Sequence, residues 1–356
     1  MRQHRIAVIA GDGIGLEVIP VAQAIVEATG RRFGFAVAWQ PQPWGCAFYR
    51  ETGRMMPPDA LAALRESDAI FLGAVGDPAV PDHVSLWGLL IPIRRAFDQY
   101  ANIRPVKLLR GMKTPLAGRG PEDLDFIVVR ENVEGEYSEI GGRLYQGTDQ
   151  EMAIQESVFT RRGVDRILRY AFELAKSRPK KHLTSATKSN GIIHTMPYWD
   201  ERVAAMQANY PGIRVDRFHI DILAAHFVAH PDWFDVVVGS NLFGDILSDL
   251  GPACAGGIGT AASANLNPER AFPSMFEPVH GSAPDIAGKG IANPVAAIWS
   301  ASMMLDHLGE ADAASAIMEA IESVTAAGKV LTRDLGGTAS TGDLGKAVLA
   351  ALAGAG

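Results

Sequence analysis

Two carboxylates spaced one helical turn apart stand out in this sequence of 356 residues. Asp245 and Asp249 lie in SNLFGDILSDL, where the spacing of apolar residues predicts a helix with both carboxylates on one face. Two like charges at this spacing destabilise a helix by about 0.2–0.5 kcal/mol, and a divalent cation with oxygen ligands would reverse that effect. The pair predicts a metal site, with a solvated acidic face as the alternative. Asp221, in the apolar segment FHIDILAAHF, is either a further ligand or an ordinary helix-start aspartate.

Three arginines are candidates for binding an anionic substrate. Arg94 and Arg104 bracket a predicted helix in IRRAFDQYANIRP, and Arg130 ends a predicted strand in VVRENVEGEYS. Guanidinium groups bind carboxylates through two parallel hydrogen bonds, so three converging arginines would suit a substrate with two carboxylates. Any one of them, taken alone, is more often a surface residue.

Two further side chains can transfer protons. Tyr137 follows Arg130 in the same turn, and Lys188 follows a predicted strand in TSATKSN. A metal and arginines nearby would lower the pKa of a lysine through like charge, and a tyrosine in such a site can act as a general acid. Without a nearby carboxylate or metal site, a solvated strand end is the preferred explanation of Lys188.

The glycine-rich segments favour a nucleotide site outside a standard Rossmann fold. GDGIG has glycines at 11, 13 and 15, which is not the full dinucleotide fingerprint, and no acidic residue ends a second strand at the expected distance. If NAD binds, the better candidate is the loop GSAPDIAGKGIANP, in which Asp285 could accept a hydrogen bond from a ribose hydroxyl and repel the 2′-phosphate of NADP. A long structural turn is the alternative.

Composition limits the class of partner and the compartment. The net charge of -7 provides no overall basic field for nucleic acid or a membrane surface, so an anionic substrate must meet a local basic cluster. Cys46 and Cys254, the two cysteines, are far apart and belong to no metal-ligand pattern, which predicts the cytoplasm. No apolar run is long enough to span a bilayer or to act as a signal peptide.

Hydrophobic periodicity predicts alternating strands and helices, and hence an α/β protein. The first helix follows GDGIG and is expected to end at Gly30. Ala-rich helices are expected from about 294 to 328, after a glycine-rich region. The other predicted strands and helices are, in chain order, strand 5–10, helix 58–66, strand 68–73, strand 125–130, helix 160–177, strand 182–188, helix 197–208 and strand 234–241.

These segments together resemble the β-decarboxylating dehydrogenases, the family of isopropylmalate and isocitrate dehydrogenases. The resemblance covers almost the whole chain and, within the family, is greatest to the tartrate and D-malate branch. It implies an α/β, isopropylmalate dehydrogenase-like two-domain fold with a mixed central sheet. Residues 1–100 and 254–356 would form a discontinuous cofactor-side domain, and 101–253 would carry the metal, proton-transfer and dimer-interface residues. The matching segments are GDGIG, VVRENVEGEY, SATKSNG, SNLFGDILSD and EPVHGSAPDIAGKGIANP, in family order.

The resemblance also implies a homodimer with shared active sites and a role for each site residue. Arg94, Arg104 and Arg130 would bind the substrate carboxylates, and Tyr137 would protonate the product. Lys188 from the partner chain would act as the base. The metal ligands for Mg²⁺ or Mn²⁺ would be Asp245 and Asp249, with Asp221 from the partner chain. The cofactor-binding residues would be Asn190, His280, Gly281, Ala283, Asp285, Ile286 and Asn293.

The implied activity is the NAD- and metal-dependent oxidation, with decarboxylation, of a small 2-hydroxy dicarboxylate. D-malate, which would give pyruvate and CO₂, and tartrate are the expected substrates, and a monovalent cation such as K⁺ is a further candidate cofactor. Trp87 and Leu90 would lie in the loop that touches the substrate, with Trp87 where the isopropylmalate enzymes usually carry Glu. 3-Isopropylmalate or another 3-alkylmalate is the alternative substrate. A metal-dependent decarboxylating lyase and a non-catalytic metabolite-binding relative are the alternatives from other classes.

Overall fold

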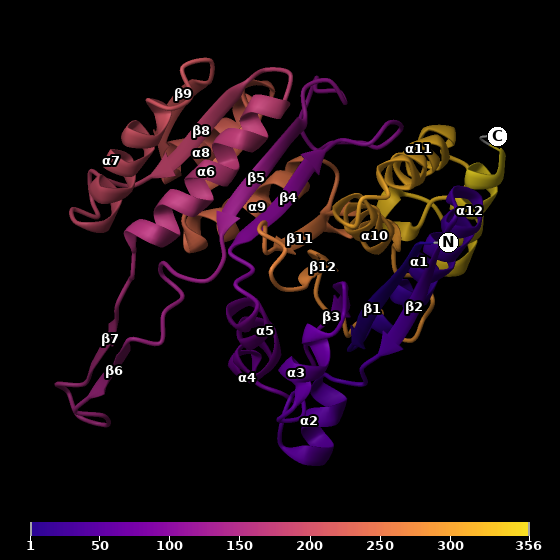
Figure 1. Cartoon of the computed structure of the whole chain (residues 1–356), viewed down its shortest axis with the longest axis horizontal. Coiled ribbons are helices and arrows are strands. Elements are labelled where there is room, and N and C mark those ends of the chain that lie inside the picture. The colour runs from indigo at the N-terminus through magenta and orange to yellow at the C-terminus, as the bar shows by residue number, and fades with distance from the viewer. Residues whose placement is uncertain (1, 355–356) are drawn as a thin grey trace.

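One sheet of ten strands runs through the whole molecule, as the computed structural model of residues 2–354 shows (Figure 1). The strand order is β2-β1-β3-β12-β11-β4-β5-β10-β8-β9. Neighbouring strands are parallel towards both ends of the sheet and antiparallel in the three central pairings, β12 with β11, β11 with β4 and β4 with β5. The predicted α/β class with a mixed sheet is therefore confirmed. The strands of this sheet are β1 (Arg2–Gly11), β2 (Phe35–Pro41), β3 (Ala69–Ala74), β4 (Ala101–Lys107), β5 (Asp125–Glu131), β8 (His182–Thr187), β9 (Arg214–His219), β10 (Val236–Gly239), β11 (Ala262–Leu266) and β12 (Ser274–Pro278).

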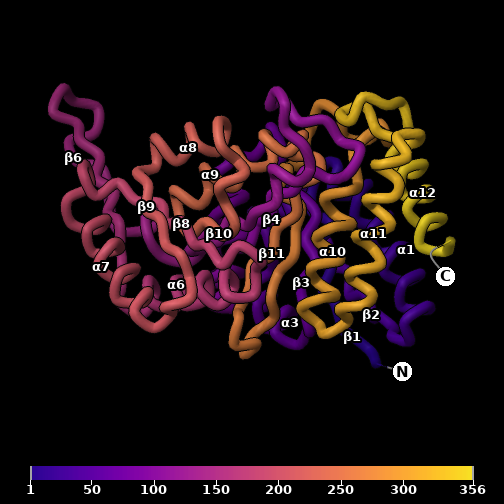
Figure 2. Tube along the Cα trace, turned by 90° about the horizontal axis from the view of Figure 1, so that it is seen from above, coloured from indigo at the N-terminus to yellow at the C-terminus, as the bar shows by residue number. Residues whose placement is uncertain are grey.

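Helices cover both faces of the sheet. At the β1 end, α1 and α10 pack on one face with α11 and α12 behind them, and α2 to α5 lie on the other. At the β9 end, α6 and α7 lie on one face and α8 and α9 on the opposite one (Figure 2). The helices are α1 (Gly15–Phe33), α2 (Cys46–Thr52), α3 (Ala60–Arg65), α4 (Asp82–Ser85), α5 (Ile91–Ala96), α6 (Arg161–Ser177), α7 (Thr195–Gln207), α8 (Ile220–Ala229), α9 (Asn241–Cys254), α10 (Val295–His307), α11 (Ala311–Ala327) and α12 (Thr341–Gly354).

Alternating side chains of each strand feed different hydrophobic clusters. In β1, Ile6 and Val8 join the cluster under α1, and Ala7 and Ile9 join the cluster under α3 and α5. Because both faces are buried, the strand is a continuous apolar run and lacks the alternation of a half-exposed strand. The same rule explains why the apolar strands were predictable as strands from their composition.

The structure corrects two helix boundaries. The first helix does not end at Gly30 but continues to Phe33, and Gly34 ends it in the left-handed conformation with φ 78°. Arg94 and Arg104 do not bracket a helix, because α5 ends at Ala96 and Arg104 lies in strand β4. The cause is the backbone just after α5, where Asp98 adopts a positive φ of 43° that a helix cannot accommodate.

A two-stranded arm, β6 (Gly141–Leu144) and β7 (Met152–Gln155), projects from the body of the molecule (Figure 1). All eight residues of its strands are exposed, including the apolar Leu144, Met152 and Ile154. Figure 2 shows the arm on the same side of the sheet as α8 and α9. An isolated hairpin is at best marginally stable in water. The exposed apolar side chains indicate that another protein surface packs against the arm.

The predicted division into two domains stays a prediction, because the sheet is continuous and β11 from the C-terminal part pairs directly with β4.

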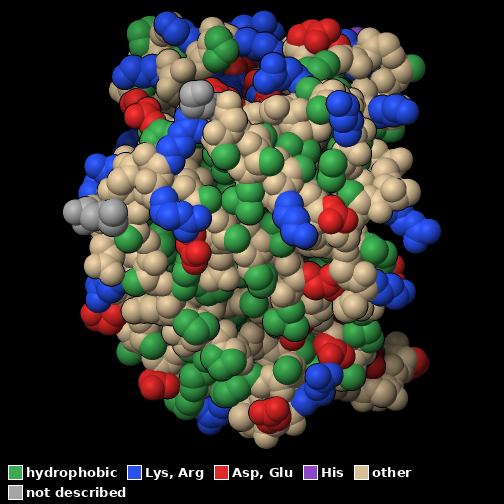
Figure 3. All heavy atoms as spheres, turned by 90° about the vertical axis from the view of Figure 1, so that its right-hand side faces the viewer, with side chains coloured by type: hydrophobic (Ala, Val, Ile, Leu, Met, Phe, Trp, Pro, Cys, Tyr) green, Lys and Arg blue, Asp and Glu red, His purple; other side chains and the backbone are tan. Residues whose placement is uncertain are grey.

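Within residues 2–354, no helix is both long and apolar enough to cross a bilayer. Cys46 and Cys254 are buried free thiols. Charges of both signs are interspersed over the face that carries α1, α11 and α12 (Figure 3).

Candidate active site

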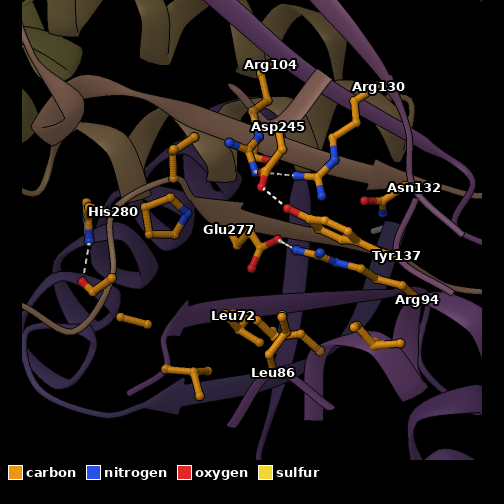
Figure 4. A pocket seen from close by; sticks show the side chains of 18 of the residues that line it. Leu72, Leu86, Arg94, Arg104, Arg130, Asn132, Tyr137, Asp245, Glu277 and His280 are labelled. Atoms are coloured by element: carbon orange, nitrogen blue, oxygen red, sulfur yellow. Dashed lines mark hydrogen bonds and ion pairs between the residues drawn. The ribbon is translucent and has the colours of Figure 1, made fainter. Parts of the chain in front are cut away.

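A cavity of about 240 Å³ lies over the antiparallel centre of the sheet, between α5 and α9 (Figure 4). Its floor is formed by β4, β5, β11 and β12, and the segment before α5 closes one side with leucine side chains. The cavity therefore has one apolar wall and one strongly charged wall. Its polar lining residues are Arg94, Arg95, Arg104, Arg130, Asn132, Tyr137, Asn241, Asp245, Ser263, Glu277 and His280.

The floor is a polar stripe that the strand register creates. Asn102 on β4 lies directly between Arg130 on β5 and Asn265 on β11, and Ser263 pairs with Glu277 across β11 and β12. The intervening residues of the same strands point to the opposite face, where they join the apolar core. Because buried polar side chains are costly unless they are hydrogen-bonded, such a stripe indicates a functional surface.

Asp245 is the centre of the charged wall. Its carboxylate accepts a hydrogen bond from the Tyr137 hydroxyl at 2.7 Å and from Nη1 of Arg130, and Nη2 of Arg104 lies 3.9 Å away. Burial pushes the pKa of Asp245 upwards, but the Arg130 charge, the Tyr137 hydrogen bond and the Arg104 charge outweigh it and hold the pKa below its usual value. Asp245 is therefore ionised at neutral pH.

Arg104 and Arg130 are buried and held at several atoms. Arg104 donates from Nε to Asn102 and from Nη1 to Asp249, both at 3.0 Å. Arg130 donates from Nε and Nη2 to the side-chain oxygen of Asn241, at 3.1 and 2.7 Å. Burial lowers the pKa of Arg104, and it lowers the pKa of Arg130 to about 10. Both guanidinium groups remain cationic at neutral pH and are fixed in orientation.

Tyr137 is brought back over the cavity by the turn after β5. Glu131 ends the strand, and its carboxylate accepts hydrogen bonds from the backbone N–H groups of Val133 and Glu134, at 2.8 and 2.9 Å. Gly135 then adopts a φ of 94°, which other residues rarely tolerate. Burial and the hydrogen bond to Asp245 raise the pKa of Tyr137 to about 12, so its hydroxyl keeps its proton at neutral pH.

Close approach of α9 to β5 depends on a glycine. A Cβ added at Gly244 would lie only 2.6 Å from Cβ of Arg130, which cannot move because it is fixed to the strand backbone. The missing side chain lets the helix pack closely enough for Asp245 to reach Arg130 and Tyr137. The close packing of α9 against β5 therefore explains why a glycine stands at position 244, next to Asp245.

Asp249 completes the predicted carboxylate pair on α9. Its side chain is 61% exposed, and burial of the remainder together with the Asp245 charge raises its pKa, although Arg104 opposes the shift. A hard cation with oxygen ligands would relieve this repulsion, so the donor set fits Mg²⁺ or Mn²⁺. Residues 2–354 contain no cluster of three or more His, Cys, Asp or Glu side chains able to hold a metal. In this part of the chain, no further His, Cys, Asp or Glu side chain joins Asp245 and Asp249 in such a group.

Lys188 and Asp221 lie apart from the cavity. The ammonium group donates to the Asp221 carboxylate at 2.9 Å, and this hydrogen bond lowers the pKa of Asp221. The Asp221 side chain is 68% exposed, and Asn190 is exposed as well. Neither Lys188 nor Asp221 is among the residues that line the cavity. The structure thus gathers the arginines, Tyr137 and the α9 carboxylates, and leaves this pair on the surface.

The loop that follows β12 borders the other end of the cavity through His280 and Gly281. The Ile14 N–H donates to the Ser282 carbonyl at 2.9 Å, so the GDGIG turn holds this loop in place. Burial lowers the pKa of His280, and its Nε2 has no hydrogen-bond partner among the described residues. Ala283 adopts a positive φ of 42°. An unpartnered buried nitrogen and an irregular backbone fit a loop that binds a ligand.

The remaining predicted cofactor residues differ in exposure. Asp285 is exposed and Ile286 is half-buried on the same loop. Asn293 is buried, its Nδ2 donates to Asp334 at 2.8 Å, and its oxygen accepts the Val295 N–H at 3.0 Å. These contacts give Asn293 a structural role at the start of α10.

The two predicted substrate-loop residues point in different directions. Leu86–Leu90 form one turn of π-helix, and Leu86 and Leu90 line the cavity. Trp87 lines a separate, largely apolar cavity of about 560 Å³ and stacks under the guanidinium of Arg95, 5.0 Å from its ring centre. In this conformation Leu90 faces the site and Trp87 packs behind it.

Sequence analysis missed most of the residues that support the arginines. Most of them lie in strands β4, β11 and β12, which were not predicted, so the period-two placement of their polar side chains went unnoticed. Asn132 follows β5, and Asn241 begins α9. A polar residue at every second position of a short apolar segment is the pattern that could have found them. The missed residues are Asn102, Asn132, Asn241, Ser263, Asn265 and Glu277.

Comparison with known proteins identifies the family. The family model for isocitrate/isopropylmalate dehydrogenase matches residues 5–348. The chain is 61% identical over 355 residues to D-malate dehydrogenase [decarboxylating] of Escherichia coli (strain K12), with 98% of each chain covered. It is 58% identical over 357 residues to tartrate dehydrogenase/decarboxylase of Pseudomonas putida, again with 98% of each covered.

Solved structures agree with the fold. Isocitrate dehydrogenase from Methylococcus capsulatus superposes with a TM-score of 0.88 at 36% identity, covering 98% of this chain and 99% of that one. A β-decarboxylating dehydrogenase from Thermococcus kodakarensis gives a TM-score of 0.79 at 36% identity, covering 99% and 96%. The predicted isopropylmalate dehydrogenase-like fold is thus confirmed. The chain belongs to the isocitrate/isopropylmalate dehydrogenase family and is a dehydrogenase.

Proposed function

We propose that this enzyme oxidises D-malate with NAD⁺ and decarboxylates it to pyruvate and CO₂, and that it also accepts tartrate. The observation that carries the proposal is the buried grouping of three arginines with Asp245 and Tyr137 in one cavity. The relatives named for D-malate and tartrate, at 61% and 58% identity, support this choice of substrate.

Substrate binding follows from the charged wall. Arg94, Arg104 and Arg130 offer guanidinium groups to the two carboxylates of a four-carbon acid, because planar donor pairs match carboxylate geometry. Leu90 on the opposite wall limits the space for a longer side chain. A cavity of about 240 Å³ suits a small dicarboxylate.

Asp245 and Asp249 would hold Mg²⁺ or Mn²⁺, with Asp221 of a second copy of the chain as the third carboxylate, and K⁺ is a further candidate cofactor. When bound, the divalent ion lowers the pKa of the substrate hydroxyl and stabilises the negative charge that develops on its oxygen. The two like-charged carboxylates one helical turn apart on α9 are the feature of the chain that favours a cation there.

Two side chains move the protons. Lys188 of the second copy would take the proton of the substrate hydroxyl. Bound NAD⁺ would serve as the hydride acceptor, so that the carbon bearing the hydroxyl becomes a ketone. The bond to the neighbouring carboxylate then breaks, CO₂ leaves, and Tyr137 donates a proton to the carbon that carried it. The pKa of about 12 keeps the Tyr137 proton in place until that step. Arg130, over the Tyr137 ring at 5.5 Å, stabilises the phenolate that remains.

NAD⁺ would bind along the loop after β12. His280 and Gly281 border the cavity and would meet the nicotinamide half, with Asn190 of the second copy near it. The adenosine half would contact Ala283, Asp285 and Ile286. The exposed Asp285 carboxylate would accept a hydrogen bond from the ribose 2′-hydroxyl and would repel the 2′-phosphate of NADP.

A homodimer with shared sites would complete this arrangement. The outer faces of α8 and α9 expose Ile222, Val228 and Ile246, which lie beside the carboxylates of the proposed metal site. The β6–β7 arm projects on the same side with its own exposed apolar residues. A two-fold pairing of these faces would bring Lys188 and Asp221 of one copy to Asp245 of the other. The division into domains 1–100 with 254–356 and 101–253 would place the cavity between them.

The test is direct assay of the purified protein with NAD⁺ and Mn²⁺. D-malate, L-tartrate and 3-isopropylmalate are added in turn while NADH absorbance is followed. We expect NADH with D-malate and tartrate, together with pyruvate from D-malate. Turnover with 3-isopropylmalate alone would assign the alternative substrate, and no NADH with any of the three would overturn the dehydrogenase proposal.

A further inference from the structure

A buried row of side-chain hydrogen bonds joins two of the three arginines beneath the cavity. Arg104 donates from Nε to Oδ1 of Asn102 at 3.0 Å, and Arg94 donates from Nη2 to Oε1 of Glu277 at 2.8 Å. Asn265 lies between these ends. Its Oδ1 accepts from Nδ2 of Asn102 at 3.0 Å, and its Nδ2 donates to Oε1 of Glu277 at 2.7 Å. Asn102 and Asn265 are completely buried.

The chemistry of the two ends gives this row a single direction. A guanidinium can only donate and an ionised carboxylate can only accept. Asn102 must therefore turn its oxygen to Arg104 and its amino group to Asn265. Asn265 must in turn present its oxygen to Asn102 and its amino group to Glu277. Asn132 also donates to the Asn265 oxygen, at 2.9 Å.

Asn265 is fixed more firmly than the arginines it connects. It lies in β11, and its backbone is paired with Asn102 of β4 on one side and Met275 of β12 on the other. Arg94 comes from α5, on a separate element, and its Nε has no hydrogen-bond partner in the described part of the chain. Asn265, which is fixed in the sheet, therefore holds the Glu277 carboxylate in place. Glu277 in turn orients Arg94, whose Nε is free to donate.

We propose that Asn265 is a positioning residue that sets the spacing of Arg94 and Arg104 for the two carboxylates of the substrate. This inference rests on the proposed function, because it concerns a dicarboxylate. Asn265 acts through its neighbours and does not contact the substrate, since it lies beneath the residues that line the cavity. Without its amino group, Glu277 loses one of two donors to the same oxygen and moves together with Arg94.

The variant Asn265→Asp gives this proposal a pH-dependent test. An ionised carboxylate at 265 cannot donate to Glu277 and repels it, although Arg94 and Arg104 at the two ends of the row reduce that repulsion. A protonated carboxyl has the shape of the amide, donates its O–H to Glu277 and accepts from Asn102. We expect the KM for D-malate to exceed the wild-type value by about tenfold or more at about pH 8.5. The variant-to-wild-type ratio of KM should fall towards one at about pH 6, where the repelled carboxyl is protonated.

Matched controls separate positioning from general damage. Asn267→Asp alters a buried amide close by, whose Nδ2 donates to the Asp98 carbonyl at 3.1 Å and not to the site, and it should leave the KM ratio independent of pH. Asn265→Leu should raise the KM for D-malate without recovery at acid pH. In both Asn265 variants the KM for NAD⁺ should stay at the wild-type value, and the KM for D-malate should change more than kcat.

The outcomes distinguish this inference from the proposed function. A wild-type protein without NADH formation from any dicarboxylate defeats the function itself. If the wild type is active, two results overturn the inference and leave the proposed function standing. Either Asn265→Asp keeps the wild-type KM for D-malate at both pH values, or its KM changes by the same factor at both. Should Asn265→Asp fail to fold, Asn265→Ser, whose hydroxyl is shorter, takes its place, and a wild-type KM for D-malate in that variant would overturn the role.

Discussion

The two parts of the proposed catalytic machinery differ sharply within one chain. Arg104, Arg130, Tyr137 and Asp245 are gathered in one cavity and are buried or half-buried. Arg130 and Tyr137 donate hydrogen bonds to Asp245, and Arg104 donates one to Asp249. The Lys188–Asp221 pair lies outside the cavity, with the Lys188 side chain half-buried and the Asp221 side chain exposed. A preorganised site needs fixed partners around each charge. This difference would follow if one chain builds the substrate-binding part and a second copy supplies the other part, as the proposed homodimer requires.

The largest effect should come from the preorganised part. Asp245→Asn keeps the shape of the side chain but removes the negative charge that faces Arg130, Arg104 and the proposed metal. We expect turnover with D-malate and Mn²⁺ to fall by about a thousandfold or more, roughly 4 kcal/mol of transition-state stabilisation. NADH formation measures the loss, and circular dichroism checks that the fold is intact.

Asp249→Asn is the companion variant for the same comparison. It should also abolish metal-dependent turnover, although its side chain is more exposed than that of Asp245. If both variants retained wild-type activity with Mn²⁺, the metal would be bound elsewhere.

The separation of the two parts can itself be tested by mixing inactive variants. Tyr137→Phe removes the acid of the cavity, and Lys188→Met removes the base on the surface, so each homodimer should be inactive. Mixed dimers contain one site with both defects and one site with neither. Unfolding and refolding the two together should restore about a quarter of wild-type activity, because half of the random dimers are hybrid and each hybrid has one intact site. A mixture as inactive as its components would show that each chain builds its site alone.

The surface proposed to pair the copies gives a smaller and more specific effect. Val228 on α8 is exposed, so Val228→Asp should cost the monomer little. In a dimer the buried carboxylate should weaken association by roughly a hundredfold, about 3 kcal/mol. Light scattering over a concentration series measures the change in mass. Leu16→Asp is the matched control on α1, which packs against α10 and α12 in the other half, and it should leave the mass unchanged.

How much of the site was predictable depended on where its residues lie along the chain. Asp245 and Asp249 were found because a single helix displays both at fixed spacing, and Arg130 and Tyr137 because they share one turn. Asn265 was not found, because it meets Asn102 only through the pairing of strands distant in sequence. Glu277 was not found, because it meets Arg94 of α5 only in the tertiary structure. Strands β4, β11 and β12 were also missed, since these short strands have mixed polarity and no local pattern fixes their partners.

The separation of Lys188 from Asp245 could not be predicted from the residues at all. Motifs indicate which side chains are chemically capable, but they do not indicate which copy of the chain supplies them. Only the resemblance to a known family suggested that the site is shared. The positions in one chain are consistent with that suggestion, because the Lys188–Asp221 pair is absent from the cavity lining.

The smallest effect on turnover is expected at the turn that carries Tyr137, where the change acts on stability instead. Burial raises the pKa of Glu131 to about 8, and Arg166, 3.7 Å away, only partly opposes this. Because the folded pKa lies above the unfolded value, the native state holds a proton that the unfolded state has released. Its contribution to stability is fully present below the unfolded pKa and is lost as pH rises towards about 8, by about 1.4 kcal/mol per pH unit at most.

Glu131→Gln should remove this slope, since the amide stays neutral and its oxygen can still accept from Val133 and Glu134. Thermal unfolding at about pH 5 and about pH 8.5 measures it: the variant should gain stability relative to wild type only at the higher pH. An equal difference at both pH values would mean that Glu131 is ionised throughout, held by Arg166, and that the turn under Tyr137 is an ion pair at neutral pH.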